Sequence, residues 1–185
     1  MTTEGYIILF CWIIFLLYWI ASARNAKPDK EVKQDTSSFQ LVIIWLLFGG
    51  FLFLKNFLLP IPQFHIALLQ TIGIVSVIIG LISAIIARKT LAQDWSKGVV
   101  LKTTQRLITN GIYNYTRHPI YSGFLLMALG TVLFLETISA TVLFIIMFLY
   151  LRFKSLQEEK LLTKHFPKEY PEYKKRTKSL IPFIY

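Results

Sequence analysis

The chain has 185 residues, of which 55% are hydrophobic, and a formal net charge of +10 at pH 7. Its mean hydropathy of +0.55 and its long apolar runs exclude an ordinary soluble domain and indicate a membrane protein. The single cysteine, Cys11, excludes an intrachain disulfide, and the three histidines lack metal-ligand spacing, so we expect no metal site. The length suits one domain covering residues 1–185.

Three apolar runs follow one another in residues 1–87, namely Tyr6–Ser22, Phe39–Leu59 and Phe64–Ala87. Each is long enough to cross a bilayer as a helix. No Lys or Arg precedes the first run, whereas four basic residues follow it, so we expect a retained transmembrane helix and not a signal peptide. In the third run small residues recur every three or four positions, which predicts close packing against a neighbouring helix.

Residues 88–185 begin with a long polar loop and contain two shorter apolar runs, Ile120–Leu135 and Ile138–Phe153. Only two residues separate these runs, which predicts a helical hairpin with a tight turn. We expect the second helix of the hairpin to continue to about His165. A packed segment should follow, because the tail is richer in aromatic residues than a disordered tail would be.

The basic residues are distributed unevenly along the chain. The loop 23–38 holds four of them, the loop 88–118 holds six and the segment 152–178 holds nine, which leaves only Lys55 for the opposite side. The positive-inside rule makes the basic side cytoplasmic, where it also faces anionic lipid headgroups, so nucleic acid is not needed to explain the charge. The sequence therefore predicts an all-α integral membrane protein of about five transmembrane helices, with its N-terminus outside and a cytoplasmic C-terminal segment.

The stretch 109–123 is polar and aromatic although apolar runs lie on both sides of it. We expect Pro119 in the first turn of a helix and His118 at the boundary. The free N–H groups of that helix start would form an anion-binding end, beside which Arg117 adds a fork-shaped donor. The alternative is that Arg117 and His118 are interfacial anchors.

Two adjacent carboxylates, Glu158 and Glu159, could complement this cationic segment. If the last apolar helix continues, Lys154 and Glu158 are four positions apart and Arg152 and Glu159 are seven apart, so each pair shares a helix face. A solvated charged face would show the same pattern. Together with the segment before Pro119, the carboxylates favour a site for a zwitterionic amino-acid group, which offers one carboxylate and one ammonium.

The stretch Gln105–Gly123, with the unit Arg-His-Pro-x-Tyr-x-Gly and the later Glu-Glu pair, resembles the isoprenylcysteine carboxyl methyltransferase family. That family belongs to a wider group with phospholipid N-methyltransferases, and the resemblance covers roughly residues 87–185. It implies an integral membrane methyltransferase with residues 88–185 as its catalytic core. It also implies that S-adenosylmethionine lies between the last membrane helices and the C-terminal segment.

Carried over by motif, the resemblance implies a cofactor pocket and an acceptor site. The cofactor residues would be Gln105, Leu107, Ile108, Tyr113, His118, Pro119, Tyr121, Gly123, Glu158 and Glu159. Arg117, with Arg152 or Lys154, would orient an anionic or polar acceptor. The family often has His in place of Gln105 and Arg in place of Lys154. The second difference bears on the acceptor, because lysine, unlike arginine, cannot bind a carboxylate through two parallel hydrogen bonds.

Three functions fit this sequence. The first is methyl transfer to a lipophilic or prenylated acceptor that arrives through the bilayer at the cytoplasmic face of a prokaryotic inner membrane, as in isoprenylcysteine carboxyl O-methyltransferases. The second is methylation of a phospholipid amine or a small thiol. The third is a non-catalytic scaffold or a transporter, although the apolar runs lack the mid-bilayer ionisable residues that transporters use.

Overall fold

The computed structural model describes residues 2–23, 66–95 and 106–181. Its α-helices are α1 (Thr3–Ala23), α3 (Ala67–Leu91), α4 (Pro119–Leu135), α5 (Ile138–His165) and α6 (Glu169–Arg176), and short 3-10 turns occur at Ala92–Asp94 and Gly111–Asn114. No β-strand occurs within these residues, so the predicted all-α class is confirmed. The predicted second span, Phe39–Leu59, and the candidate site residue Gln105 lie outside the described residues.

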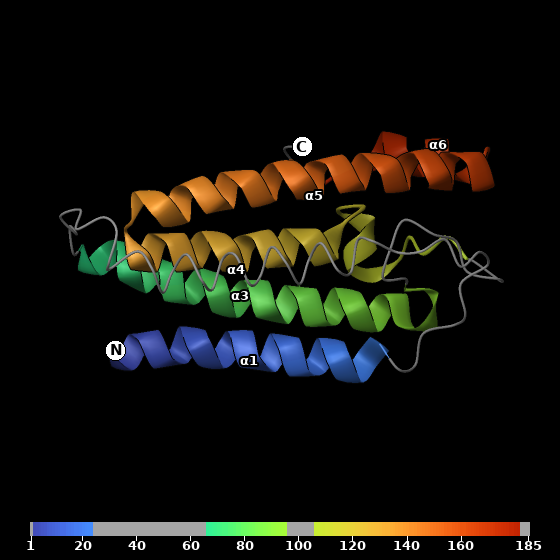
Figure 1. Ribbon diagram of the computed structural model, residues 1–185. Coiled ribbons are helices and arrows are strands. Elements are labelled where there is room, and N and C mark those ends of the chain that lie inside the picture. The colour runs from blue at the N-terminus through green and yellow to red at the C-terminus, as the bar shows by residue number, and fades with distance from the viewer. Residues whose placement is uncertain (1, 24–65, 96–105, 182–185) are drawn as a thin grey trace.

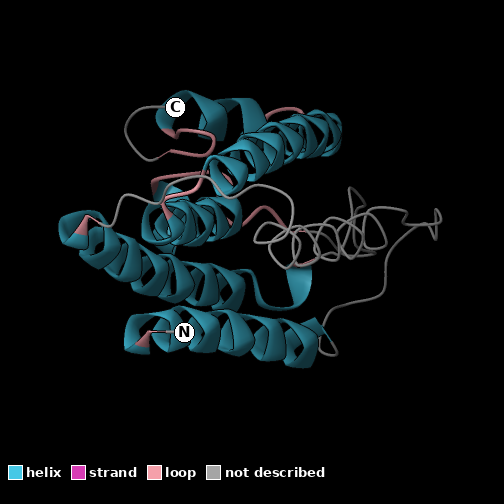
Figure 2. Cartoon of the chain, turned by 60° about the vertical axis from the view of Figure 1, so that its left-hand side comes forward, coloured by secondary structure: helices cyan, strands magenta, loops and turns pink. Residues whose placement is uncertain are grey.

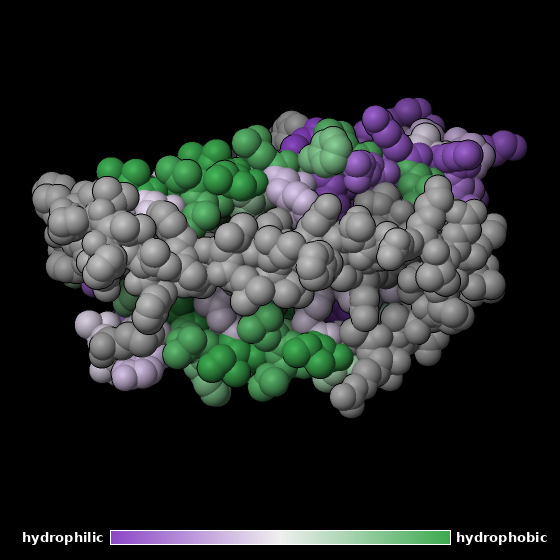
Figure 3. All heavy atoms as spheres, viewed as in Figure 1, coloured by the Kyte–Doolittle hydropathy of each residue, from purple (hydrophilic) through white to green (hydrophobic). Residues whose placement is uncertain are grey.

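Four long helices lie side by side in the order α1, α3, α4 and α5, and α6 lies near the C-terminal end of α5 (Figure 1). Of these, α1, α3 and α5 are long and apolar enough to cross a membrane, and α4 is a shorter apolar helix. Large apolar side chains are exposed along α1, α3 and α5, as expected where lipid surrounds the helices. Figure 3 shows hydrophobic surface over the helices and hydrophilic surface around the end of α5 and α6. The protein is therefore an integral membrane protein whose polar groups gather at one end.

Glycines bring α3 and α4 into backbone contact. A Cβ atom on Gly80 would lie 2.6 Å from the carbonyl oxygen of Gly123, and one on Gly73 would lie 2.6 Å from that of Gly130. Such small residues let helices approach closely where lipid supplies no hydrophobic drive. The predicted packing of the small-residue face in the third run is confirmed, and the lack of a side chain at Gly123 is accounted for by the same contact.

The end of α3 is joined to the end of α1 by Arg88. This side chain is buried, and it donates from Nη2 to the carbonyl of Ser22 at 2.7 Å and from Nη1 to the carbonyl of Ala92 at 2.6 Å. Its guanidinium also lies over the ring of Trp95, 4.4 Å from the centroid. The helix therefore continues to Leu91, four residues past the predicted end of the apolar run, because Arg88 has partners inside the protein and does not need water.

The helix boundaries around α4 and α5 agree with the sequence. His118 is the N-cap of α4 and Pro119 occupies its first turn, as predicted. The hairpin turn consists of Glu136, which has a left-handed backbone, and Thr137, which is the N-cap of α5. The α5 helix ends at His165, so its predicted continuation beyond the apolar run is confirmed.

The tail after α5 is packed, as predicted. Helix α6 folds back beside the end of α5 (Figure 2), and its two tyrosines, Tyr170 and Tyr173, are buried. The segment Thr177–Ile181, which we call the C-terminal strap, then runs beside residues 115–118. The amide of Arg117 donates to the strap at 2.8 Å and the amide of His118 at 3.1 Å, so the strap closes the polar end of the hairpin.

Candidate active site

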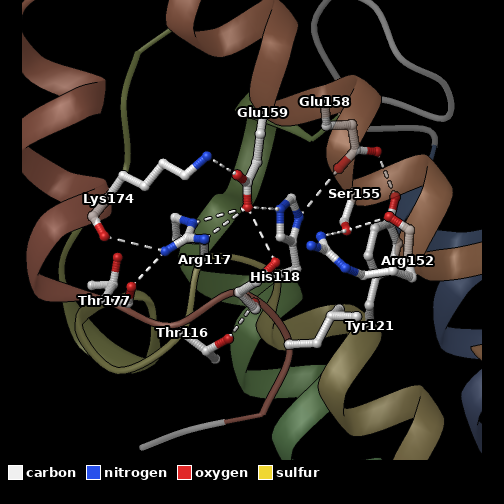
Figure 4. Close-up of polar contacts among 12 residues, drawn as sticks. Thr116, Arg117, His118, Tyr121, Arg152, Ser155, Glu158, Glu159, Lys174 and Thr177 are labelled. Carbon is white, nitrogen blue, oxygen red and sulfur yellow. Dashed lines mark hydrogen bonds and ion pairs between the residues drawn. The ribbon is translucent and has the colours of Figure 1, made fainter. Parts of the chain in front are cut away.

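The start of α4, the polar part of α5, and α6 bring charged side chains into one group (Figure 4). We call this group the polar cluster, and it consists of Arg117, His118, Tyr121, Glu158, Glu159 and Lys174. The predicted cationic segment and the predicted Glu-Glu pair therefore do meet in space. Their meeting depends on α5 continuing past the apolar run, which carries the two carboxylates to the level of the α4 N-terminus.

Glu159 is the most heavily bonded member of the polar cluster. Its Oε1 accepts hydrogen bonds from Arg117 Nε at 3.0 Å and from Ser179 Oγ at 3.1 Å, and it lies 2.9 Å from Arg117 Nη2. Its Oε2 lies 2.8 Å from Lys174 Nζ. The side chain is only 4% exposed, so its partners within the protein enclose it.

The guanidinium of Arg117 points toward the tail. Besides Glu159, it bonds to the backbone carbonyls of Thr177 and, at 3.4 Å, of Lys174. Its side chain is 8% exposed. The guanidinium of Arg117 is therefore bonded to Glu159 on one side and to the tail on the other. The sequence pattern did not predict these partners within the protein.

His118 lies between the two carboxylates. Its Nδ1 is 3.4 Å from Glu158 Oε2 and its Nε2 is 3.4 Å from Glu159 Oε1, while its ring stacks on Tyr121 with centroids 5.6 Å apart. Burial disfavours the charged imidazolium, but the bonds and charges of Glu158 and Glu159 outweigh it and raise the pKa of His118. Within the described residues, Nε2 makes no hydrogen bond of good geometry, but it is buried and faces Glu159 Oε1.

Glu158 is less enclosed than its neighbour. It is 23% exposed and accepts a hydrogen bond from the hydroxyl of Tyr121. Lys154 is buried on the same side of α5, with Nζ 6.0 Å from the centroid of the Tyr121 ring. Arg152 contacts Ser155 Oγ at 3.5 Å. Lys154 thus lies over the ring of Tyr121, whereas Arg152 lies beside Ser155 near His118 (Figure 4).

The remaining predicted residues surround the polar cluster. Tyr113 is buried, and its carbonyl accepts a hydrogen bond from the hydroxyl of Tyr173 at 2.6 Å. Leu107 lines a polar cleft between the segment 106–109 and α6, and Ile108 is half-buried. Pro119 and Gly123 line an apolar cavity.

This apolar cavity has a volume of about 540 Å³ and lies between α4, α5 and the strap. Its walls include Leu126 and Leu129 from α4, Phe144 and Phe148 from α5, and Leu180 and Ile181 from the strap. Sequence reasoning missed the cavity. The spacing of Phe144 and Phe148 places both on one face of α5, but an aromatic pair at that spacing is equally typical of lipid-facing or packed positions.

Comparisons with known proteins identify the family. The sequence matches the phospholipid methyltransferase family over residues 68–169, which is more than half of the chain. It is 30% identical over 184 residues to protein-S-isoprenylcysteine O-methyltransferase of Saccharomyces cerevisiae, covering 92% of this chain and 75% of the yeast protein. The chain belongs to the isoprenylcysteine carboxyl methyltransferase family. The resemblance predicted from the Arg-His-Pro unit and the Glu-Glu pair is therefore confirmed.

Other members of the isoprenylcysteine carboxyl methyltransferase family are similar over shorter lengths. A probable protein-S-isoprenylcysteine O-methyltransferase of Oryza sativa subsp. indica is 34% identical over 116 residues, 61% of each chain, so this chain spans about three fifths of its length. A solved eukaryotic intramembrane Ras methyltransferase, isoprenylcysteine carboxyl methyltransferase, shares the fold with a TM-score of 0.62 and 24% identity. That match covers 80% of this chain and 53% of the solved one.

Proposed function

We propose that the protein is an S-adenosylmethionine-dependent methyltransferase acting on a lipophilic acceptor, of the isoprenylcysteine carboxyl O-methyltransferase type. The observation that supports this proposal is the apolar cavity directly beside the polar cluster. Pro119 and Gly123 line the cavity, while His118 and Tyr121, on the same helix start, belong to the cluster. A charged cofactor and a hydrophobic acceptor could thus meet at one end of the membrane helices.

The polar cluster suits the amino-acid end of S-adenosylmethionine. Glu158, which is partly exposed, would accept from its ammonium group, and the positive charge of His118 beside it would attract its carboxylate. Bound there, the cofactor would supply a methyl group on a sulfonium, which needs no metal for its transfer. The ring of Tyr121 would face that positive charge, an attraction of about 0.5–2 kcal/mol.

The rest of the catalysis would come from alignment. Holding both reactants in line can lower a barrier by up to about 7–11 kcal/mol. Lys154, buried beside Tyr121, would attract the carboxylate of the acceptor, and the apolar cavity would hold its hydrocarbon chain. Arg117 would hold the tail and would not touch the acceptor, because its donors already face Glu159 and the strap.

We propose that this site faces the cytoplasm and that the N-terminus is external, an orientation that the distribution of basic residues supports under the positive-inside rule. The relatives reported above are eukaryotic, so the predicted prokaryotic inner membrane stays a prediction. An acceptor with a hydrophobic tail would reach the cavity through the bilayer, which raises its concentration near the site.

Calorimetry with S-adenosylhomocysteine tests the cofactor assignment. The purified protein should bind it, and Glu158→Ala should abolish binding, whereas Glu4→Ala, which removes an exposed carboxylate near the start of α1, should leave the affinity unchanged. Equal affinity of the Glu158 variant and the wild type would overturn the assignment.

Methyl transfer from labelled S-adenosylmethionine tests the acceptor. We expect N-acetyl-S-farnesylcysteine to be methylated and the label to be released as volatile methanol by base, as a methyl ester requires. The second candidate acceptor is a phospholipid amine, which the match to the phospholipid methyltransferase family favours. Label that appears in extracted phospholipid and is not released as volatile methanol by base would support this second acceptor and exclude the ester.

A further inference from the structure

The C-terminal strap touches both halves of the site. Its Leu180 and Ile181 form part of the wall of the apolar cavity. The residue before them, Ser179, donates from Oγ to Glu159 in the polar cluster at 3.1 Å. The strap therefore connects Glu159 of the polar cluster to the cavity wall on which an acceptor chain would lie.

Glu159 has little capacity left for a ligand. An ionised carboxylate offers about four acceptor positions, and donor atoms of Arg117, Lys174 and Ser179 approach it at 2.8–3.1 Å. Its side chain is 4% exposed, against 23% for Glu158. The two adjacent carboxylates are thus in different situations, one enclosed by the tail and one open to a ligand.

The strap is held on its other side by α4 and the residues before it. The carbonyl of Ser179 accepts from Thr116 Oγ1 at 2.6 Å and from the amide of His118 at 3.1 Å, and the carbonyl of Leu180 accepts from Ser122 Oγ. The hydroxyl of Ser179 extends in the other direction, to α5. Glu159 and Ser179 thus link the strap to α5 next to Leu180 and Ile181, which line the cavity.

We propose that Glu159 and Ser179 are positioning residues that hold the strap across the hairpin and so set the affinity of the apolar cavity for the acceptor, while Glu158 serves the cofactor. This inference rests on the proposed function and divides its site into two parts. Loss of the Ser179 hydroxyl removes the hydrogen bond between the strap and α5 next to the cavity, so Leu180 and Ile181 are held less firmly, by packing against α5 and by the bonds to α4. The amino-acid end of the cofactor keeps its partners Glu158 and His118.

The test uses Ser179→Ala in the full chain, purified in detergent. A hydrogen bond to a buried charged group is strong enough that its loss should raise KM for N-acetyl-S-farnesylcysteine about five- to ten-fold. The affinity for S-adenosylhomocysteine should stay within about two-fold of the wild type. The matched control is Thr163→Ala, which removes a hydroxyl bonded to the backbone carbonyl of the same Glu159 but not to the strap, and which should leave both values unchanged.

Glu159→Gln and Glu158→Gln complete the comparison. Glu159→Gln should raise the KM for the acceptor by a larger factor than it raises the Kd for S-adenosylhomocysteine. Glu158→Gln should raise the Kd for S-adenosylhomocysteine by a larger factor than it raises the KM for the acceptor. The inference is overturned if Ser179→Ala and Thr163→Ala have the same acceptor KM. It is also overturned if Glu159→Gln abolishes S-adenosylhomocysteine binding while Ser179→Ala leaves the acceptor KM unchanged.

Hydrogen exchange separates failure of this inference from failure of the proposed function. If the wild type binds S-adenosylhomocysteine but does not methylate N-acetyl-S-farnesylcysteine, the proposed acceptor is wrong. The attachment of the strap is then tested by the hydrogen-exchange rates of the backbone amides of Arg117 and His118, which donate to carbonyls of the strap. Faster exchange of these two amides in Ser179→Ala than in Thr163→Ala supports the link to α5, and equal exchange contradicts it.

Discussion

Arg117 and Glu159 are 42 positions apart in the sequence, yet Arg117 Nη2 lies 2.9 Å from Glu159 Oε1. Both side chains are less than a tenth exposed. The pair joins the start of α4 to the polar part of α5, and the carbonyl of Thr177 adds the tail to the same guanidinium. Three segments of the chain are thus held by one buried ion pair, directly beside the residues proposed to bind the cofactor.

We expect Arg117→Met to destabilise the protein by about 1.5–3 kcal/mol, because Glu159 loses a charged hydrogen-bond donor while Lys174 and Ser179 still contact it. Unfolding in a denaturing detergent, followed by circular dichroism, measures the change. Lys175→Met is the control, since Lys175 pairs with Glu172 at the surface, where both side chains are about 70% exposed. Exposed pairs contribute little. Equal losses in the two variants would contradict the structural role of Arg117.

Gly80→Ala should weaken the contact between α3 and α4. The added Cβ would lie 2.6 Å from the carbonyl oxygen of Gly123, and backbone on both sides leaves little room to adjust. Overpacking of this kind costs about 1–3 kcal/mol. Ile82→Ala on the same helix, at an exposed apolar position, should cost less in the same unfolding experiment. A Gly80 variant as stable as the wild type would show that the helices separate without penalty.

Trp12 and Thr131 connect α1 to α4 within the apolar region. The indole Nε1 of Trp12 donates to Thr131 Oγ1 at 3.1 Å. A double-mutant cycle with Trp12→Phe and Thr131→Ala should give a coupling free energy of about 0.6–1.7 kcal/mol, the range found for side-chain hydrogen bonds between membrane helices. Strictly additive single effects would show that this hydrogen bond does not help to hold α1 in place.

The raised pKa of His118 predicts how stability depends on pH. Below its unfolded pKa of about 6.5 the imidazolium is charged in both states, and its pairing with the carboxylates stabilises the folded protein fully. That stabilisation is lost as the pH rises through the raised folded pKa. The charged and titratable groups around it are Glu158 and Glu159 from α5, Tyr121 from α4, Arg117 beside it and Lys174 from α6.

The measurement compares the wild type with His118→Gln between pH 6 and pH 9. The wild type should be the more stable of the two near pH 6, and its advantage should shrink as the pH rises, because the glutamine does not titrate. A difference between the two proteins that is independent of pH would contradict the assignment of the stabilising charge to His118.

Much of the fold follows from local patterns in the sequence. The Pro119 start of α4, the two-residue hairpin turn and the end of α5 at His165 were all predicted, because caps, prolines and runs of hydropathy act over a few residues. The spacing of Lys154 and Glu158 also placed both on one face of α5. The family was recognisable from the Arg-His-Pro unit and the Glu-Glu pair, which are local motifs as well.

The sequence by itself thus determined the long helices among the described residues, the membrane class, the family and the residue types of the site. Only the tertiary structure decided which partner each charge has. It placed Arg117 against Glu159 and the strap, left Glu158 more open, and formed the apolar cavity from α4, α5 and the strap. The physical reason is that adjacent carboxylates look alike in sequence, whereas their burial and their donors depend on segments that fold back from far along the chain.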